Sequence, residues 1–505
     1  MVLLITAVIG SIVDMAAFLN LATGVNSWIL KTFSNVFAIA VFGFVLTCLW
    51  VFVSPLGKIK IGGANATPLL SRWNWFAITL CTTIAIGILF WGTAEPMYHL
   101  YDPGGRDIVA ASPEAVRFSL VSLFMHWAFS PYAIYTVPAL TFALVYHNMD
   151  RSYSISEPIN VLIGRRLPRT LCDLLDAVVL LSLVLGMAAS LGACMLLLSG
   201  GIGKITGLHT TPVLLAMIAA LIVTAVLISS LSGLTHGIRV LSDLNTKLFF
   251  AFVAFVFIFG PTLYILKESA GAIWGYLVEF VPRSLIVGEA GDRQWANAWT
   301  IFYWANWLAW APVTAMFLGR IARGYSVRAF IAINFFAPSL FAIVWMSVFG
   351  GFAMAVDAAT DGSLKAVLDS EGPEAVLFQA VTSLPLSALL VPILVILSFL
   401  SYVTAADSNT EAIAMICEKK SAEQGADAAS LQIPQEMPQG KTRPALKIIW
   451  VILLVSTAWI MTAYTGIDGV RMLSNLGGLP ALFIVIALNL TLIKLSLNPK
   501  LVSKD

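Results

Sequence analysis

The sequence is poor in charged residues. Only 11% of its 505 residues are Asp, Glu, Lys or Arg, whereas 59% are hydrophobic. A soluble protein carries roughly 25% charged residues, so this chain cannot cover its surface with polar groups and must expose much of it to lipid. Its 29 basic and 27 acidic residues nearly cancel, which argues against a nucleic acid as partner.

Cysteine and histidine are scarce and scattered. None of the five cysteines forms a C-x-x-C pair, so neither a metal knuckle nor a disulfide framework is indicated. Of the five histidines, only His126 falls well inside an apolar run. We therefore expect no metal, no cofactor and no membrane enzyme, since haem and metal sites need clustered ligands. No nucleotide-binding motif is evident, so no ATP-driven engine is expected.

Long apolar runs dominate instead. A run of about 20 apolar residues crosses the hydrocarbon core as a helix, and these runs lack the alternation of barrel strands. We predict an all-α membrane protein with about twelve transmembrane helices. The predicted spans are 2–20, 36–54, 74–94, 118–146, 173–200, 210–231, 246–266, 297–318, 328–352, 384–417, 447–465 and 479–497.

Basic residues gather in one set of loops. With a cytoplasmic N-terminus, most of the 29 Lys and Arg residues fall on the cytoplasmic side, as the positive-inside rule requires. We therefore expect both termini in the cytoplasm and the protein in the inner (plasma) membrane. Residues 418–446 are expected to form a cytoplasmic loop, and the amphipathic segment 272–285 to lie along the outer interface.

Aromatic residues concentrate in two of the predicted helices. The first cluster, "TIFYWANWLAWAP" (300–312), also contains a polar amide, Asn306. Positions three and four apart share a helix face, so its rings form one stripe. Its large aromatics are Tyr303, Trp304, Trp307 and Trp310.

The second cluster, "HWAFSPYAIYTVP" (126–138), contains Trp127, Tyr132 and Tyr135. One interpretation of both clusters is an interfacial belt, because Trp and Tyr gather at headgroup level. The other is a box of ring faces for a cation, since aromatic quadrupoles attract quaternary ammonium groups, which have no N–H to donate. An ion channel would instead show a filter loop or a charged ring, and neither is evident.

Four segments resemble the betaine–choline–carnitine transporter family. They are "FWGTAEPMYH" (90–99), "HWAFSPYAIYTVPAL" (126–140), "FYWANWLAWAPVTAMFLGRIARG" (302–324) and "YVTAADSNT" (402–410). The resemblance implies a secondary transporter that carries a small onium zwitterion or cation by alternating access. Family members are usually homotrimers, so we expect substrate, membrane lipid and further copies of this chain as partners.

The resemblance also implies a division of the chain. Two N-terminal helices (1–73) would precede two inverted five-helix repeats, helices 3–7 (74–266) and helices 8–12 (297–505, including the loop 418–446). An external loop with the amphipathic helix (267–296) would join the repeats.

The family's substrate residues carry over to matching positions. These are Trp127, Tyr132, Tyr135, Trp307 and Trp310, with Tyr303 and Trp304 as gate or support residues. Asn306 departs from the pattern, because family members with well-formed boxes usually have tryptophan there. Its amide either shifts selectivity towards a smaller or more polar onium zwitterion or packs against a neighbouring helix.

The residues that resemble the family's sodium site are altered. In the family, helix 3 has a glycine-rich break. Here the matching stretch "TIAIG" keeps Gly87 but has Thr83 and Ala85 in place of two glycines. The family's Thr–Ser pair on helix 10 is replaced here by Thr404 and Ala405. Lys247 is either an anchor at the membrane surface or a fixed cation that replaces sodium. We expect sodium-independent transport by exchange or proton coupling, with sodium- or proton-coupled symport as the alternative. The candidate proton carriers are Glu95, His126, Asp407 and Glu411.

Overall fold

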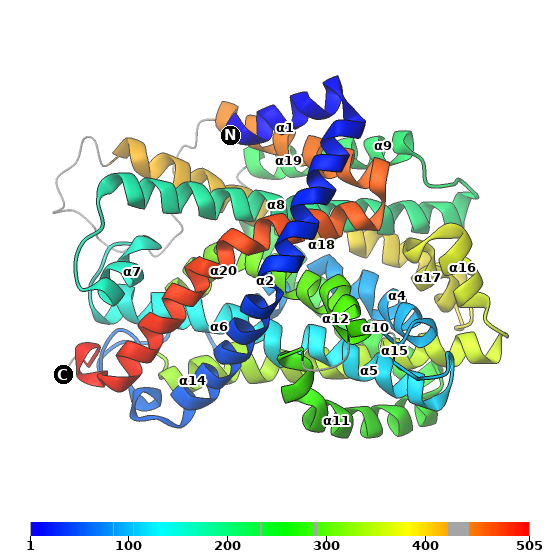
Figure 1. Cartoon of the computed structure of the whole chain (residues 1–505), viewed down its shortest axis with the longest axis horizontal. Helices are drawn as coiled ribbons and strands as arrows, with labels where there is room; N and C mark the ends of the chain where they lie inside the picture. Colours follow the sequence, from blue (N-terminus) through cyan, green and yellow to red (C-terminus); the bar gives the residue numbers. More distant parts are fainter. Residues whose placement is uncertain are drawn as a thin grey trace.

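The computed structural model describes residues 2–83, 85–104, 106–232, 235–286, 290–422 and 444–503. These residues are helical almost throughout, and among them the only β pairing is an isolated bridge between Lys60 and Ser326. This confirms the predicted all-α class (Figure 1).

The α-helices are α1 (Val2–Val13), α2 (Met15–Val53), α3 (Arg72–Thr83), α4 (Ala85–Tyr101), α5 (Pro113–Trp127), α6 (Phe129–Ala143), α7 (Ser156–Ile163), α8 (Arg169–Thr206), α9 (Pro212–Ser232), α10 (Thr235–Phe259), α11 (Thr262–Ser284), α12 (Ala290–Ala296), α13 (Phe302–Ile321), α14 (Val327–Ile331), α15 (Ala337–Ala359), α16 (Ser363–Glu371), α17 (Pro373–Val381), α18 (Ser387–Ala422), α19 (Pro444–Thr465) and α20 (Ile467–Leu497). Short π-helical turns are η2 (Leu144–Asn148), η3 (Asn297–Ile301) and η4 (Ala332–Phe336), and 3-10 turns are η1 (Pro55–Lys58) and η5 (Pro499–Leu501).

Several helices are long and apolar enough to cross a membrane. Six described segments meet this requirement by length and composition, or seven if the bent pair α10–α11 is one span. Shorter apolar helices include Leu4–Val13, Pro212–Ile228 and Ser387–Val403. The protein is thus a multi-pass membrane protein, while the count of twelve spans and their division into two repeats stay predictions.

The first predicted span, 2–20, is interrupted at Asp14. The Asp14 side chain accepts a hydrogen bond from the backbone N–H of Ala17 at 2.9 Å and so caps the start of α2. Aspartate is a strong N-cap residue because its carboxylate satisfies a donor that the helix leaves unpaired. The helix after the cap is then continuous to Val53 and covers the second predicted span.

The predicted span 246–266 ends earlier, at Phe259. Pro261 has no N–H and clashes with the carbonyl four residues before it, which stops the helix. The hydroxyl of Thr262 donates to that carbonyl, on Phe257, and the chain turns by 107° into α11. The predicted amphipathic helix is therefore longer than 272–285, and α11 lies along one edge of the molecule (Figure 1).

Helix α13, which carries the first aromatic cluster, is packed among other helices. It contacts α6, α8 and α20. Gly478 of α20 has no room for a side chain beside the backbone of Ala305, so these two helices approach closely. The aromatic stripe of α13 is therefore surrounded by helices and does not form a belt on the lipid-facing surface.

Candidate functional site

A helix break positions the first aromatic cluster. α5 ends at Trp127 and α6 begins at Phe129, with Ala128 between them in a non-helical conformation (φ −104°, ψ −112°). Pro131 explains the break, because it cannot donate to the carbonyl of Trp127 and its ring clashes there. The N–H of Phe129, which the break leaves without its helical partner, donates to the hydroxyl of Tyr276 on α11 at 3.3 Å.

Three aromatic rings, from α5 and α6, contact Trp307 of α13. The Trp307 ring centroid lies 5.6 Å from that of Trp127 and 5.9 Å from that of Tyr132. The Tyr135 ring centroid lies 5.4 Å from that of Trp307. All four side chains are at most 4% exposed. We call this set, Trp127, Tyr132, Tyr135 and Trp307, the aromatic box.

Tyr303 covers one end of the aromatic box. It lies one helical turn before Trp307, and its centroid is 5.3 Å from that of Trp127. Tyr303 also contacts two rings outside the box. Its ring centroid lies 6.5 Å from that of Trp299 and 4.7 Å from that of His126, and both pairs are stacked. Tyr303 therefore lies beside the box, and its role as a gate or support residue stays a prediction.

A buried carboxylate holds Trp127 in place. Glu95 of α4 accepts a hydrogen bond from Trp127 Nε1 on its Oε2 atom at 2.8 Å. Its Oε1 atom contacts His126 Nδ1 at 2.6 Å and His99 Nε2 at 3.2 Å. His126 Nε2 in turn pairs with the hydroxyl of Thr300 at 3.0 Å. We call these residues the Glu95 network. It contacts the indole N–H of Trp127 and so orients this member of the box.

The Glu95 network is more clustered than the sequence indicated. His99 was not placed inside the membrane, yet it is fully buried beside His126. The ligand atoms of Glu95, His99 and His126 lie within 4.8 Å of one another. This arrangement runs against the expectation of scattered ligands, and through Glu95 the cluster also contacts the Trp127 indole. The i, i+4 spacing of Glu95 and His99 was the signal that could have revealed it.

Two predicted site residues lie apart from the box. Trp310 packs against Gly186 of α8, where a Cβ would lie 3.1 Å from its ring. Trp304 is fully buried. Among the residues that the structure describes, neither makes a ring contact with a box residue. A step of three residues falls about 60° short of a full helical turn. Trp304 and Trp310 therefore flank, on opposite sides, the face that Trp307 turns towards α6.

Asn306 faces another helix. Its Oδ1 atom accepts a hydrogen bond from the hydroxyl of Ser474 on α20 at 3.1 Å. This contact links α13 to α20, at the level where Gly477 and Gly478 bring the two helices together. Of the two interpretations offered for the amide, the contact favours packing between helices.

The residues expected at the coupling site are only partly described. The Thr83 hydroxyl donates to the carbonyl of Thr79 at 2.8 Å, within α3. A Cβ on Gly87 would lie 3.0 Å from the Trp127 ring, so glycine lets that indole approach α4. Lys247 is exposed on α10. The side chains of Thr404 and Ala405, and those of Asp407 and Glu411, lie outside the described residues.

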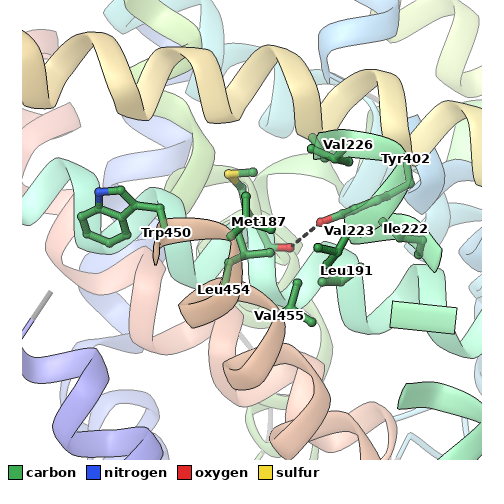
Figure 2. A pocket seen from close by; sticks show the side chains of 11 residues that line it. Met187, Leu191, Ile222, Val223, Val226, Tyr402, Trp450, Leu454 and Val455 are labelled. Atoms are coloured by element: carbon green, nitrogen blue, oxygen red, sulfur yellow. Dashed lines mark hydrogen bonds between the residues drawn. The ribbon is translucent and has the colours of Figure 1, made fainter. Parts of the chain in front are cut away.

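An apolar crevice lies elsewhere, between α8, α9, α18 and α19. Its lining includes Met187, Ile222, Tyr402 and Leu454, and the Tyr402 hydroxyl donates to the carbonyl of Met187 at 3.3 Å (Figure 2). None of the predicted site residues lines it. It offers little to orient a charged ligand, so the aromatic box remains the candidate site.

Comparison with known proteins points to one family. The family model described as "BCCT, betaine/carnitine/choline family transporter" matches residues 1–500. The ectoine/hydroxyectoine transporter of Virgibacillus pantothenticus is 29% identical over 446 residues, which make up 88% of this chain and 84% of the relative. The glycine betaine transporter OpuD of Bacillus subtilis is 27% identical over 486 residues, 95% of this chain and 90% of the relative.

A third relative, glycine betaine transporter 1 of Vibrio parahaemolyticus, is 32% identical over 391 residues, which are 77% of this chain and 74% of that protein. The family match extends over almost all of the chain and therefore includes every segment that forms the aromatic box and its supports. This protein thus belongs to the betaine/carnitine/choline transporter family.

Proposed function

We propose that this protein is a secondary active transporter that carries a small onium zwitterion or cation across the plasma membrane by alternating access. The observation that carries the proposal is the aromatic box, in which three buried rings contact the buried ring of Trp307. A desolvated cation gains about 2 kcal/mol or more from an aromatic face. Rings also avoid the cost of a permanent charge placed directly against the substrate within the membrane.

The substrate class follows from the same groups. A quaternary ammonium or sulfonium group suits ring faces, whereas a primary amine would need hydrogen-bond acceptors. Trp307 Nε1 is buried and has no hydrogen-bond partner among the described residues, so it is a donor suited to an acidic end of the same substrate. Betaine, choline, carnitine and dimethylsulfoniopropionate types all fit, and the relatives named above carry glycine betaine or ectoine by name.

Transport is proposed to be independent of sodium. A sodium site needs several oxygen ligands, and this sequence replaces one hydroxyl of the Thr–Ser pair by Ala405 and two glycines by Thr83 and Ala85. The Thr83 hydroxyl is engaged within its own helix. The exposure of Lys247 supports a role as a membrane anchor, so the proposal does not depend on it as a replacement cation.

The arrangement in the membrane is proposed from charge and surface. Both termini are assigned to the cytoplasm by the distribution of basic residues. The end of the bundle that holds α11, α16 and α17 then faces outwards. α11 exposes Trp274, Leu277 and Val278, each more than half exposed, which supports its place in a homotrimer contact.

A substrate panel tests the proposal. The purified protein in liposomes should take up at least one radiolabelled member of the set betaine, choline, carnitine and dimethylsulfoniopropionate, and unlabelled members should compete. The assignment of the box would be contradicted if none of these compounds is taken up and none quenches tryptophan fluorescence.

A further inference from the structure

Arg471, in the first turns of α20, lies outside the aromatic box with an unusual set of contacts. Its guanidinium carbon lies 4.2 Å from the centroid of the Trp299 ring, and Tyr98 and Phe302 stand 5.9 and 5.8 Å away. The side chain is 19% exposed. Its Nη1 atom pairs with Asp468 at 3.2 Å. Its Nε and Nη2 atoms are buried and have no hydrogen-bond partner among the described residues.

The two unpartnered nitrogens share one edge of the guanidinium plane. That edge is the fork on which arginine binds a carboxylate through two parallel N–H···O bonds. Burying a charged donor without a hydrogen-bond acceptor costs free energy. The cation–π contact with Trp299 does not explain why these two nitrogens are left without an acceptor. Asp468 reaches only the far nitrogen, and its own side chain is 71% exposed. The fork is therefore available for an anion that the described part of the chain does not supply.

The place of Arg471 connects it to the box. Trp299, the ring beneath the guanidinium, stacks on Tyr303, and Tyr303 contacts Trp127. The distances between successive groups, from the guanidinium to Trp299, Tyr303 and Trp127, are 4.2, 6.5 and 5.3 Å. A zwitterion of a few heavy atoms cannot span them all at once, so a carboxylate on Arg471 and an onium group in the box belong to two successive positions of the substrate.

We propose that Arg471 binds the carboxylate of an incoming zwitterion at an outer station, before the onium group reaches the aromatic box. The inference rests on the proposed function, because it assumes a zwitterionic onium substrate entering from this end. The fork is covered in this conformation, so binding takes place when this end of the bundle opens during alternating access. In the closed form, the guanidinium occupies the cation position on the Trp299 ring face.

Two substrates that share a trimethylammonium group separate this role from a structural one. Glycine betaine has a carboxylate, whereas choline has a hydroxyl. Arg471→Gln should raise the KM for glycine betaine at least about tenfold, the loss expected for charge-assisted hydrogen bonds. It should leave the KM of choline, or its inhibition constant if choline is poorly carried, within about twofold. Arg471→Lys keeps the charge but not the planar fork and should remain impaired for glycine betaine.

Arg117→Gln is the matched control. Arg117 lies on α5 at the same end of the bundle, its side chain is 49% exposed, and it pairs loosely with Glu279 at 3.6 Å, so neither substrate should be affected. An equal rise for both substrates in Arg471→Gln would overturn the inference, as would no rise for either. If the wild-type protein binds neither substrate, the proposed function itself fails, which is a different result.

Discussion

Trp307 is the residue whose removal tests the aromatic box most sharply. It is the ring that all three other members contact. Trp307→Leu keeps an apolar side chain but removes the quadrupole that attracts a cation. Loss of one desolvated cation–π contact of about 2 kcal/mol corresponds to roughly 30-fold weaker binding, since about 1.4 kcal/mol is a factor of ten. Trp307→Phe keeps a smaller ring and should lose less.

The assay is equilibrium binding of a radiolabelled onium substrate to the purified protein, together with thermal unfolding of the same samples. Replacing a buried tryptophan also destabilises the fold by several kcal/mol, so a control must separate folding from affinity. Trp75 of α3 is equally buried and packs on Tyr325 and Phe330. Trp75→Leu should lower the melting temperature yet leave the dissociation constant unchanged. If Trp307→Leu binds within threefold of wild type, the box is not where the onium group sits.

Three further predictions concern residues outside the box. Glu95→Gln removes the carboxylate that holds Trp127 and should weaken substrate binding about tenfold; unchanged affinity in a binding assay would show that the indole needs no such support. Asn306→Trp should break the contact with Ser474, lower the melting temperature and leave the ranking of competing ligands unchanged; a reordered ranking would restore the selectivity role. Burial raises the pKa of Glu374, on α17 outside the spanning helices, from 4.5 to about 7. The folded state therefore keeps a proton that the unfolded state loses, so stability falls as pH rises from 4.5 to about 7 and levels off above that. Glu374→Gln should abolish that decline, worth up to about 3 kcal/mol, in thermal unfolding between pH 5 and 8, and an unaltered pH profile would contradict it.

The sequence predicted the all-helical membrane class because that class depends on local pattern. Local pattern also indicated which rings share a helix face, while their role in binding stays a prediction. Composition alone required lipid-facing surface. The spacing of Tyr303 and Trp307 placed their rings on one face of α13, and the structure places that face against Trp127. Periodicity does not say which neighbouring helix each face meets. For that reason Trp310 was expected in the box but packs on α8, beside Gly186.

Other features depend on contacts between distant segments. The Glu95 network joins α4 to the end of α5, and the second histidine, His99, was not recognised as buried. No local pattern marks Arg471, because its neighbours Trp299 and Tyr98 come from other parts of the chain. Helix ends followed local chemistry that a hydropathy window averages out, as the cap at Asp14 shows.

Counterflow in liposomes tests the central claim most directly. Liposomes that contain the purified protein are loaded with an unlabelled onium zwitterion and diluted into a trace of the labelled compound, in buffers free of sodium. The account predicts transient accumulation of label at the same rate with and without sodium, and its loss in Trp307→Leu. Accumulation that strictly requires sodium, or that survives in Trp307→Leu, would contradict sodium-independent transport through the aromatic box.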